Sequence, residues 1–327
     1  MMRRPAGPRR LVFAGEAIVD VVMRVPALPR RGGDVLATST EILAGGGFNV
    51  MAAAARQGLP VRYAGGHGTG PWGDVIRAAL AAEGIGLLRP PDPDRDTGFD
   101  VALVEADAER TFVTQLGAET VRGPGAWDAV PAGPGDAVYV SGYGLVPPES
   151  GPALSRWAAN LPSGVLLFVD PGPLVAQVPS VLLDPVLSRC DWLSCNHREA
   201  GLLIGAPPAD TEPAEAARRL LARGAAANVI VRAGAGGCYL AELGSAGAVH
   251  VRSPRVTAVD TTGAGDAHSG AFLAALADGH SPVVAAARAN AAAAFAVTRR
   301  GPATAPDRAQ LDAWLSAGDG AAADRPR

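Results

Sequence analysis

The 327-residue sequence contains no lysine, so arginine supplies all of its fixed positive side-chain charge. This absence excludes a Walker-type phosphate loop, whose lysine reaches the terminal phosphates, and the lysine–glutamate pair of protein kinases. It also excludes Schiff-base chemistry on a lysine amine. Any phosphate that the chain binds must therefore be held by backbone amides, by arginine or by a metal ion.

Cysteines and long apolar runs are also scarce. Cys190, Cys195 and Cys238 are odd in number and lack metal-ligand spacing, which favours reduced thiols in the cytoplasm. Glycine, proline and charged residues interrupt each apolar run before it is long enough to span a bilayer. With a net charge of −3 and no basic run, neither nucleic acid nor an anionic membrane is expected as a partner.

Short apolar runs rich in β-branched residues alternate with alanine-rich helical runs along most of the chain. This alternation predicts an α/β fold with a mostly parallel central sheet and helices on both faces. In such sheets ligands bind at the carboxyl ends of the strands, so the strand-to-helix turns are the place to look for a site. Residues 11–317 are predicted to form one domain, between flexible termini at 1–10 and 318–327.

Two segments, approximately 21–44 and 97–120, break this rhythm because they alternate apolar and polar residues. A hairpin bend is expected in the second of them, near Asp107–Glu109. Together the segments predict a small antiparallel sheet outside the main one, which would serve as a lid that excludes water. Additional edge strands on the main sheet fit the same periodicity equally well.

The segment "VDTTGAGDAHSGAF" (259–272) places two acids around a glycine-rich bend that leads into a helix. Its glycines let the backbone approach a ligand, and the N–H groups and dipole of the helix start attract an anion. A strand is predicted just before the bend, at "RVTAV". Asp266, at the helix start, could take a proton from an attacking hydroxyl. The alternative is an ordinary N-terminal helix acid.

Three other motifs each have a structural and a functional interpretation. Asn49, in "LAGGGFNVMAAAARQG", would cap a helix or bind a polyol hydroxyl. Asn196 and Glu199, in "NHRE", form a capping box or hold waters around Mg²⁺. The turn "RAGAGG", which starts at Arg232, suits phosphate but also an ordinary glycine-rich hairpin.

A further motif matches the spacing of a dinucleotide-binding site. "GTGPWG" (68–73) satisfies the dinucleotide-binding spacing G-x-G-x-x-G. However, Pro71 and Trp72 are bulky where a pyrophosphate would approach, and no acid ends a following strand at the expected distance. A dinucleotide site, and with it an oxidoreductase, is therefore not expected.

Taken together, these motifs resemble the PfkB/ribokinase family of carbohydrate kinases. "GGGFNVMAAAARQGLPVRYAGGHGTGPWG" and "DTTGAGDAHSGAF" look like its two signatures, "NHRE" like its N-x-x-E motif and "RAGAGG" like its phosphate turn. They occur in family order and span Leu11 to about Leu315. The resemblance implies a ribokinase-like fold with a β-sheet lid that often mediates dimerisation. It also implies transfer of the ATP γ-phosphoryl group to a hydroxyl, normally a hydroxymethyl group, of a sugar or sugar derivative.

The resemblance also implies site residues and cofactors. Asp266 would be the base, and the amides of Gly263, Ala264, Gly265 and Asp266 the anion hole. Substrate hydroxyls would be bound by Asp20, Gly46 and Asn49. Asn196 and Glu199 would organise Mg²⁺; Arg232, Gly234 and Gly237 would border the ATP phosphates; and Asn290 would lie near the adenine. A monovalent cation, K⁺, would be held by backbone carbonyls at Asp260, Thr262, Ala296, Arg299 and Gly301.

Departures from the ribokinase pattern leave the substrate open. Ile18 stands where ribokinases carry an asparagine, and the first glycine-rich turn is one residue shorter and lacks their lysine. The pattern is closer to bacterial sugar kinases of the family whose substrates are not assigned. A nucleoside kinase of the same fold is the nearest alternative, with Phe48, Phe99 and Phe112 stacking on a base. A non-catalytic sugar- or nucleotide-binding protein is the alternative of another class.

Overall fold

The structure is a computed structural model, and it describes residues 7–317 except 107–108, 122, 124 and 246. The predicted flexible terminus 318–327, residues 1–6 of the other, and the tip of the predicted hairpin bend lie outside the described residues. Arg10 is already part of the first strand, and its guanidinium binds the carboxylate of Asp136. The ordered domain thus begins before the predicted boundary at residue 11.

A nine-stranded sheet forms the centre of the larger unit, in the order β13-β12-β11-β10-β9-β8-β1-β4-β5. Pairing is parallel from β11 through to β5, and antiparallel only for β12 and β13. This confirms the predicted mostly parallel sheet. Its strands are β1 Arg10–Ala14, β4 Val61–Tyr63, β5 Gly86–Leu87, β8 Asp136–Ser141, β9 Leu166–Asp170, β10 Trp192–Asn196, β11 Asn228–Arg232, β12 Cys238–Glu242 and β13 Ala248–Val251.

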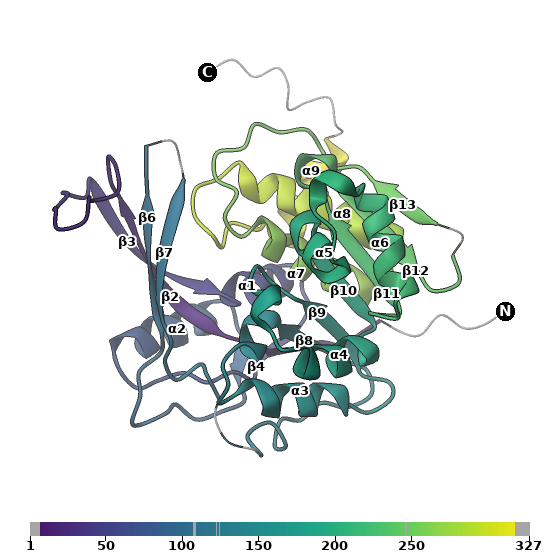
Figure 1. The fold of residues 1–327 in the computed structure, drawn as a ribbon, viewed down its shortest axis with the longest axis horizontal. Helices are drawn as coiled ribbons and strands as arrows, with labels where there is room; N and C mark the ends of the chain where they lie inside the picture. The colour runs from purple at the N-terminus through teal and green to yellow at the C-terminus, as the bar shows by residue number, and fades with distance from the viewer. Residues whose placement is uncertain (1–6, 107–108, 122, 124, 246, 318–327) are drawn as a thin grey trace.

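Helices cover both faces of this sheet (Figure 1). They are α1 Phe48–Arg56, α2 Pro71–Ala82, α3 Gly151–Ala159, α4 Ser180–Arg189, α5 His197–Ile204, α6 Pro213–Ala222, α7 Ala264–Ala277, α8 Pro282–Val297 and α9 Arg308–Ser316. Short 3₁₀ turns lie at Gly142–Leu145, Val175–Gln177, Pro208–Asp210 and Gly234–Gly236.

Alternate residues of each central strand enter two different cores. Leu11 and Phe13 of β1 pack with α1, α2, α7 and α8, whereas Val12 and Ala14 pack with α3 to α6. A strand that is buried on both faces has no polar face, which explains the nearly continuous apolar runs in the sequence. Because neighbouring strands are parallel, the ends of β1, β8, β9, β10 and β11 meet at one edge.

A separate four-stranded sheet, here called the lid sheet, stands beside the larger unit (left in Figure 1). Its order is β3-β2-β6-β7, with β2 and β6 parallel and both outer pairs antiparallel. Its strands are β2 Ala17–Arg24, β3 Ser39–Gly46, β6 Phe99–Val104 and β7 Arg110–Gln115. The predicted small sheet outside the main one is confirmed, and the alternative of extra edge strands is wrong. The sheet is mixed rather than antiparallel as predicted, because its central pair, β2 and β6, is parallel.

Two local predictions differ from the structure. The run "RLVFAGEAIVDVV" (10–22), whose apolar pattern predicts a single strand, forms two strands in different sheets, β1 and β2, separated at Gly15 and Glu16. The lid sheet therefore begins at residue 17 rather than 21. No strand forms at "RVTAV" (255–259), although its residues have high β-propensity.

Candidate active site

A cavity of about 550 Å³ at the strand-end edge lies between the lid sheet and the start of α7. It is lined by lid residues such as Asp20 and Asp100, by Asn49 of α1, and by Gly263 and Asp266 at the bend. Residues 143–154, which follow β8, complete its wall. This places the strand-end site where an α/β sheet binds ligands.

The glycine bend leads directly into α7, with Gly263 in the left-handed conformation at φ +73°. A Cβ at this position would lie 2.0 Å from the carbonyl oxygen of Pro302, so only glycine fits. N–H groups in the first turn of a helix have no intrahelical partner and can bind an anion. One of those proposed for the anion hole is already engaged, because the amide of Ala264 donates to the carbonyl of Thr261 at 3.3 Å.

Asp266 lies in this first turn and lines the cavity. Its Oδ2 accepts a hydrogen bond of 3.0 Å from Nδ2 of Asn49. Burial raises the pKa of the Asp266 carboxyl to about 6, with a further rise from Asp170 that Asn49 and Arg232 oppose. A carboxylate with a pKa just below neutral is ionised at pH 7 and still basic enough to accept a proton. Two motifs far apart in sequence thus meet at one pair of side chains.

The lid sheet contributes two further acids to the cavity lining. Asp20 of β2 and Asp100 of β6 are direct partners in the parallel register, so both side chains lie on the same face of the sheet. Burial raises the pKa of Asp20 to about 7, with Asp100 and Asp266 adding to the rise. Burial raises the pKa of Asp100 to about 6. Gly45 makes room for this pair, since a Cβ there would lie 2.1 Å from each carboxylate oxygen of Asp20.

Glu16, in the connection from β1 to β2, also lines the cavity. Its Oε1 accepts a hydrogen bond of 3.0 Å from the hydroxyl of Ser141, but its buried Oε2 has no partner. Burial raises the pKa of this carboxyl to about 8, so it is mostly protonated at pH 7. It can therefore donate a hydrogen bond as well as accept one.

Arg232, at the end of β11, points into a cluster of polar side chains beneath the bend. Its Nη1 donates to Oδ2 of Asp170 at 2.8 Å and to the hydroxyl of Ser194 at 2.7 Å. Its Nη2 lies 3.7 Å from Oε2 of Glu199. The guanidinium also lies about 3.5 Å from the position a Cβ of Gly265 would take. The arginine thus neutralises two buried carboxylates directly below the predicted anion hole.

The other predicted nucleotide residues surround this cluster. Asn196 and Glu199 form a capping box at α5, as the structural interpretation predicted, and Nδ2 of Asn196 also donates to Oε1 of Glu199. Burial raises the pKa of Glu199, assisted by Asp170. In the turn after β11, Gly234 and Gly237 have positive φ angles, and a Cβ at Gly237 would lie 2.1 Å from the carbonyl oxygen of Val251.

Asn290 of α8 is engaged within the protein. Its side-chain amide donates to the carbonyls of Val251 and Arg252, at 2.9 and 3.3 Å. Its side chain is only 3% exposed. These two hydrogen bonds hold the segment after β13 against α8.

The five residues of the predicted cation site come from two segments that lie together: the loop before α7, and the last turn of α8 with the loop that follows it. The carboxylate of Asp260 accepts the N–H groups of Thr262 and Gly301, at 2.9 and 3.2 Å. It is also paired with Arg110 from the start of β7 in the lid sheet. Although burial acts against it, these contacts hold the pKa of Asp260 below its usual value. Arg110 thus ties the lid sheet to the loop before the bend.

The carbonyl oxygens expected to hold K⁺ are partly engaged. The carbonyl oxygen of Ala296 accepts hydrogen bonds from the N–H of Arg299 at 3.0 Å and from the hydroxyl of Thr304 at 3.1 Å. The same hydroxyl lies 3.4 Å from the carbonyl oxygen of Gly301. A cation here would have to displace the Thr304 hydroxyl.

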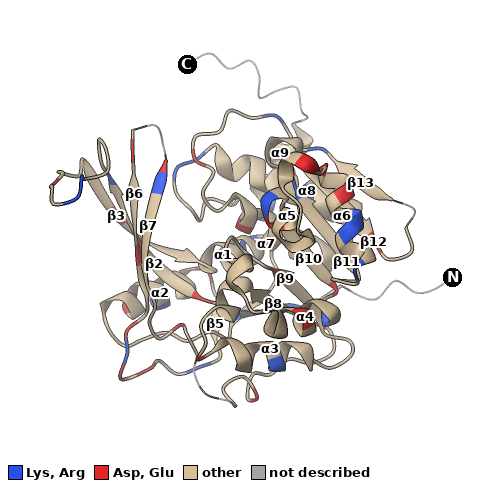
Figure 2. Cartoon of the chain, viewed as in Figure 1, with Lys and Arg blue, Asp and Glu red and all other residues tan. Residues whose placement is uncertain are grey.

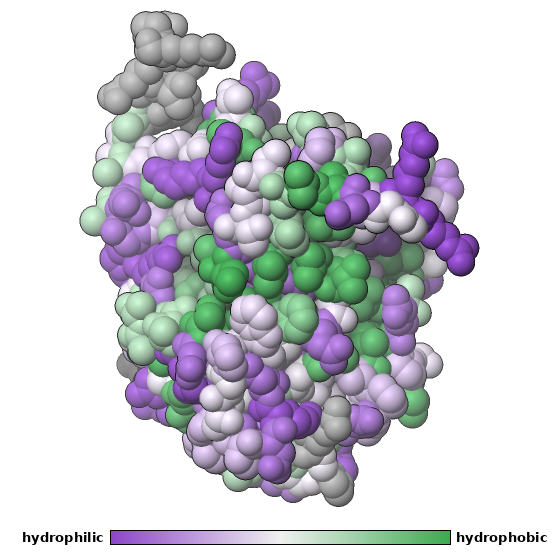
Figure 3. Space-filling model, turned by 90° about the vertical axis from the view of Figure 1, so that its left-hand side faces the viewer, coloured by the Kyte–Doolittle hydropathy of each residue, from purple (hydrophilic) through white to green (hydrophobic). Residues whose placement is uncertain are grey.

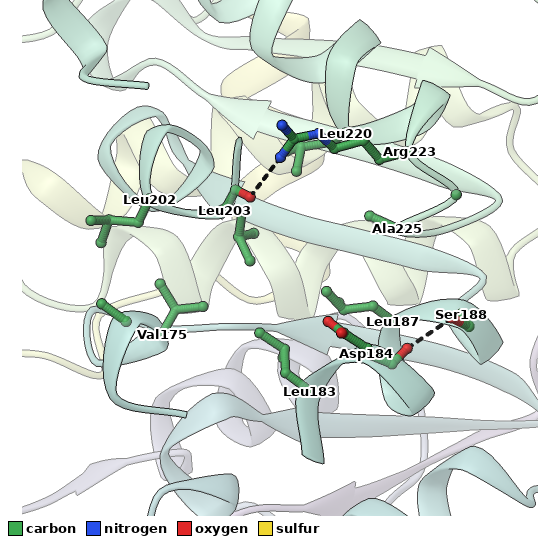
Figure 4. Close-up of a pocket in the computed structure, with 12 residues that line it drawn as sticks. Val175, Leu183, Asp184, Leu187, Ser188, Leu202, Leu203, Leu220, Arg223 and Ala225 are labelled. Carbon is green, nitrogen blue, oxygen red and sulfur yellow. Dashed lines mark hydrogen bonds between the residues drawn. The ribbon is translucent and has the colours of Figure 1, made fainter. Parts of the chain in front are cut away.

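Another cavity, of about 410 Å³, lies between α4, α5 and α6 on the outer side of the sheet (Figure 4). Two of its polar side chains bind neighbouring main chain: Arg223 donates to the carbonyl of Leu203, and Ser188 to that of Asp184. The carboxylate of Asp184 also lines it. Most of the remaining lining is leucine and valine. Because no polar groups converge on a common point, this cavity is not the candidate site.

Sequence reasoning missed Glu16, Asp100 and Asp170. Asp100 stands between apolar residues in a predicted strand, and Asp170 ends a buried strand, so each carried a signal that could have been used. Glu16 was hidden because a single strand was predicted across it. Of the three aromatic residues considered for stacking, only Phe112 lines the cavity, whereas Phe48 is buried in the core and Phe99 packs on Trp72.

Known proteins share this architecture. The family model described as pfkB family carbohydrate kinase matches residues 8–309. The uncharacterized sugar kinase YegV of Escherichia coli is 32% identical over 302 residues, covering 92% of each chain. The structure of ribokinase from Thermotoga maritima matches with a TM-score of 0.78 and 23% identity, covering 94% of this chain and 99% of that one. Aminoimidazole riboside kinase from Salmonella enterica, in complex with aminoimidazole riboside and an ATP analog, matches with a TM-score of 0.75 and 26% identity, covering 94% and 100%.

Proposed function

Because the chain belongs to the pfkB family of carbohydrate kinases, we propose that it transfers the γ-phosphoryl group of ATP to a hydroxymethyl oxygen of a sugar or sugar derivative, with Asp266 as the base. The observation that carries this proposal is the position of Asp266. It lines the strand-end cavity, accepts a hydrogen bond from Asn49, and lies in the first turn of α7 beside the glycine bend.

In the proposed reaction Asp266 removes a proton, and the glycine bend stabilises the negative charge of the transferred group. Asp266 accepts the proton of the acceptor hydroxyl, and the oxygen forms a bond to the γ-phosphorus. The bond from that phosphorus to the bridging oxygen breaks, and its electron pair leaves with ADP. Transfer of this kind requires alignment and neutralised charge rather than covalent help. The fixed N–H groups of the bend and the dipole of α7 supply that stabilisation without reorganising.

We propose that Asn196 and Glu199 would hold Mg²⁺ through bridging water. Among the described residues no group of three or more His, Cys, Asp or Glu side chains could hold a metal ion directly. Bound there, Mg²⁺ would neutralise the charge of the ATP phosphates. We include K⁺ because the carboxylate of Asp260 joins the two segments that carry the predicted carbonyl ligands. Binding of K⁺ would displace the Thr304 hydroxyl from these carbonyl oxygens.

An ADP-release screen over sugars, sugar acids, polyols and nucleosides tests the function, with Mg²⁺ or EDTA and with K⁺ or Na⁺. We expect acceptor-dependent ADP release that EDTA abolishes and a phosphorylated product that mass spectrometry detects. Ligand-induced thermal stabilisation without phosphorylated product would instead identify a binding protein that keeps the fold. Equal rates in K⁺ and Na⁺ would remove K⁺ from the proposal.

We also propose that the lid sheet mediates a homodimer. Apolar side chains gather across the middle of the lid-facing side of the molecule (Figure 3). Large apolar residues of the lid sheet and its flanking loops are 50% or more exposed, namely Leu36, Ile42, Phe112, Val113 and Leu116. Ile42 and Val113 lie in one cross-strand row, on the opposite face of the lid sheet from Phe112, which lines the cavity. Exposed apolar surface of this kind marks interaction sites. Acidic and basic positions, in contrast, are interspersed over both units (Figure 2).

Val113→Glu is expected to produce a monomer, because it places a charge in the centre of an apolar contact. Size-exclusion chromatography with light scattering measures the mass. Val181→Glu is the matched control, since Val181 is also highly exposed, at 75%, but lies on α4 of the larger unit. If the unsubstituted protein is monomeric at micromolar concentration, the dimer proposal is wrong.

We place the protein in the cytoplasm. Its three cysteines are buried and free, which suits a reducing compartment. In the described part of the chain, no helix has both the length and the apolar character needed to cross a bilayer. Recovery of the native protein with a periplasmic fraction would contradict this placement.

A further inference from the structure

Glu16 is an acid of the cavity wall to which the proposed reaction gives no role. It lies in the two-residue connection between β1 and β2, where the chain passes from the main sheet to the lid sheet. Among the described residues that line the cavity, none is arginine, lysine or histidine. A carboxylate that is removed from water and has no positively charged partner is destabilised relative to the neutral acid. The surroundings of Glu16 therefore favour its protonated form.

The titratable groups around Glu16 act in the same direction. Burial contributes most to the raised pKa of its carboxyl, and Glu119, after β7, and Asp266, at the start of α7, add to the rise. Only hydrogen bonds from Ser141 and from its own backbone oppose it. The other titratable neighbours are phenols, which are neutral at pH 7: Tyr63 of β4, Tyr139 of β8 and Tyr143 in the turn after β8.

The hydrogen bonds of the carboxyl assign its proton to one oxygen. The Ser141 hydroxyl accepts the N–H of Tyr143 at 3.3 Å and donates to Oε1 of Glu16 at 3.0 Å. Oε1 therefore acts as an acceptor, which leaves the acid proton on Oε2.

The oxygen that carries the proton lacks a partner. Oε2 is buried and makes no hydrogen bond with any of the described residues, although Glu16 as a whole is partly exposed and lines the cavity. Buried polar atoms are normally paired, so this unpaired donor requires an explanation. The last torsion of a glutamate side chain is broad, so a small rotation presents Oε2 to a molecule in the cavity. The missing partner is a hydrogen-bond acceptor.

We propose that Glu16 is a substrate-binding residue that donates a hydrogen bond from Oε2 to an oxygen of the substrate. This inference rests on the proposed kinase function and adds a residue to it. A carboxylate accepts hydrogen bonds but cannot donate them. The neutral acid therefore supplies a contact to a lone pair of the substrate, which the ionised side chains of Asp20 and Asp266 cannot supply.

The first test is spectroscopic and needs no substrate. Infrared difference spectra between pH 7 and pH 10, recorded for the unsubstituted protein and for Glu16→Gln, isolate the carbonyl stretch of the protonated Glu16 carboxyl. We expect this band at pH 7, with loss at a midpoint near pH 8, and we expect it to be absent from Glu16→Gln. A Glu16 that is ionised at pH 7 has no hydrogen to donate, and that result would overturn the inference.

The second test measures kcat/KM with the acceptor that gives the highest value in the ADP-release screen. Glu16→Met removes the polar atoms and is expected to lower kcat/KM by about tenfold to a hundredfold, because a substrate oxygen then lacks its donor. Glu16→Gln keeps an oxygen that accepts from Ser141 and adds an N–H donor. It is expected to exceed Glu16→Met by at least about threefold. Equal losses in the two variants, or no loss in Glu16→Met, would contradict the proposed contact.

The pH dependence separates binding from a supporting role in the turn after β8. The ratio of kcat/KM between the unsubstituted protein and Glu16→Gln is expected to fall about tenfold from pH 7 to pH 9, because the acid loses its proton while the amide keeps its donor. Glu212→Gln is the matched control, since Glu212 is exposed before α6 and does not line the cavity. A ratio for Glu16→Gln that stays as constant as that for Glu212→Gln would remove Glu16 from the binding residues.

Failure of this inference can be distinguished from failure of the kinase function. ADP release that Glu16→Met leaves unchanged would overturn the inference alone. If no acceptor releases ADP, the kinase function is wrong, and thermal melts at pH 7 with D-ribose, D-fructose and inosine decide the inference. A rise in Tm that Glu16→Met loses and Glu16→Gln keeps would support the contact. No rise with any of the three, or the same rise in both variants, would dismiss it.

Discussion

Asp266→Asn is expected to lower kcat by about 10²–10⁴-fold, the contribution typical of a positioned general base. Asparagine keeps the shape of the side chain and its hydrogen bond with Asn49 through an amide flip, but it cannot accept the acceptor's proton. The measurement is steady-state ADP release together with Kd for ATP. The Kd is expected to change little, because the backbone of the bend is unaltered.

The fold of this variant should be intact or more stable. Burial and the nearby Asp170 both disfavour the charged form of Asp266, as its raised pKa shows, so a neutral isostere relieves a cost. A thermal melt therefore provides the control. A kcat within about threefold of the unsubstituted protein would show that another group takes the proton.

The pH profile tests the same assignment. Asp266, with a pKa of about 6, and Asp20, with a pKa of about 7, must lose protons before they can act as base and hydroxyl acceptor. Since kcat/KM reports the free enzyme, it is expected to fall as pH decreases through the window from about 7 to about 6. A profile that is flat between pH 8 and pH 5 would contradict both roles.

Arg232→Met is expected to lower the free energy of unfolding by about 3–5 kcal/mol, because it leaves buried carboxylates without their partner. The arginine and Asp170 side chains are 14% and 13% exposed, and Glu199 is 4% exposed. Two acids would then face each other below the bend in a poorly solvated place. Urea denaturation measures the difference.

Arg218→Met is the matched control, since Arg218 pairs with Glu215 on an exposed face of α6, with side chains 54% and 41% exposed. Surface pairs contribute about 0–1 kcal/mol, so little change is expected. If Arg232→Met does not fold, Arg232→Lys keeps the charge and is expected to recover part of the loss. A loss below about 1 kcal/mol for Arg232→Met would show that the cluster is not held by this arginine.

The bend and its surroundings could be predicted from sequence because the signal is local. In "DTTGAGD" the glycines, the helix start and the acid lie within seven residues, and the structure places Asp266 in the first turn of α7, in the cavity wall. Asn49 was recognised for a similar reason, since its helix follows a glycine-rich turn. That these two residues bind each other was not visible, because 217 positions separate them.

The acidic pair of the lid sheet could not be derived in the same way. Asp20 and Asp100 become neighbours only through the parallel register of β2 and β6, which brings together strands distant in sequence. A period of two indicates which residues share a face of one strand, but it does not identify the neighbouring strand or its register. The acidic character of the cavity is therefore a property of the tertiary structure.

The two errors in the strand prediction have separate physical causes. At "RVTAV" the residues favour an extended chain, but no neighbouring strand offers a ladder there, so propensity alone produces no strand. At Gly15 and Glu16 the backbone passes from the main sheet to the lid sheet, although apolar residues lie on both sides of this point. A Cβ at Gly15 would lie 2.8 Å from the ring of Phe13, which shows how tightly the chain turns there.

The ion pair between Arg110 and Asp260 has a consequence for turnover. It fastens the tip of the four-stranded sheet to the loop that carries the bend. If the lid sheet opens to release product, this pair must break first, and opening rather than phosphoryl transfer would then limit the rate of each cycle. Salt weakens partly exposed charge pairs. The enzyme would then turn over faster in a concentrated electrolyte than in a dilute one.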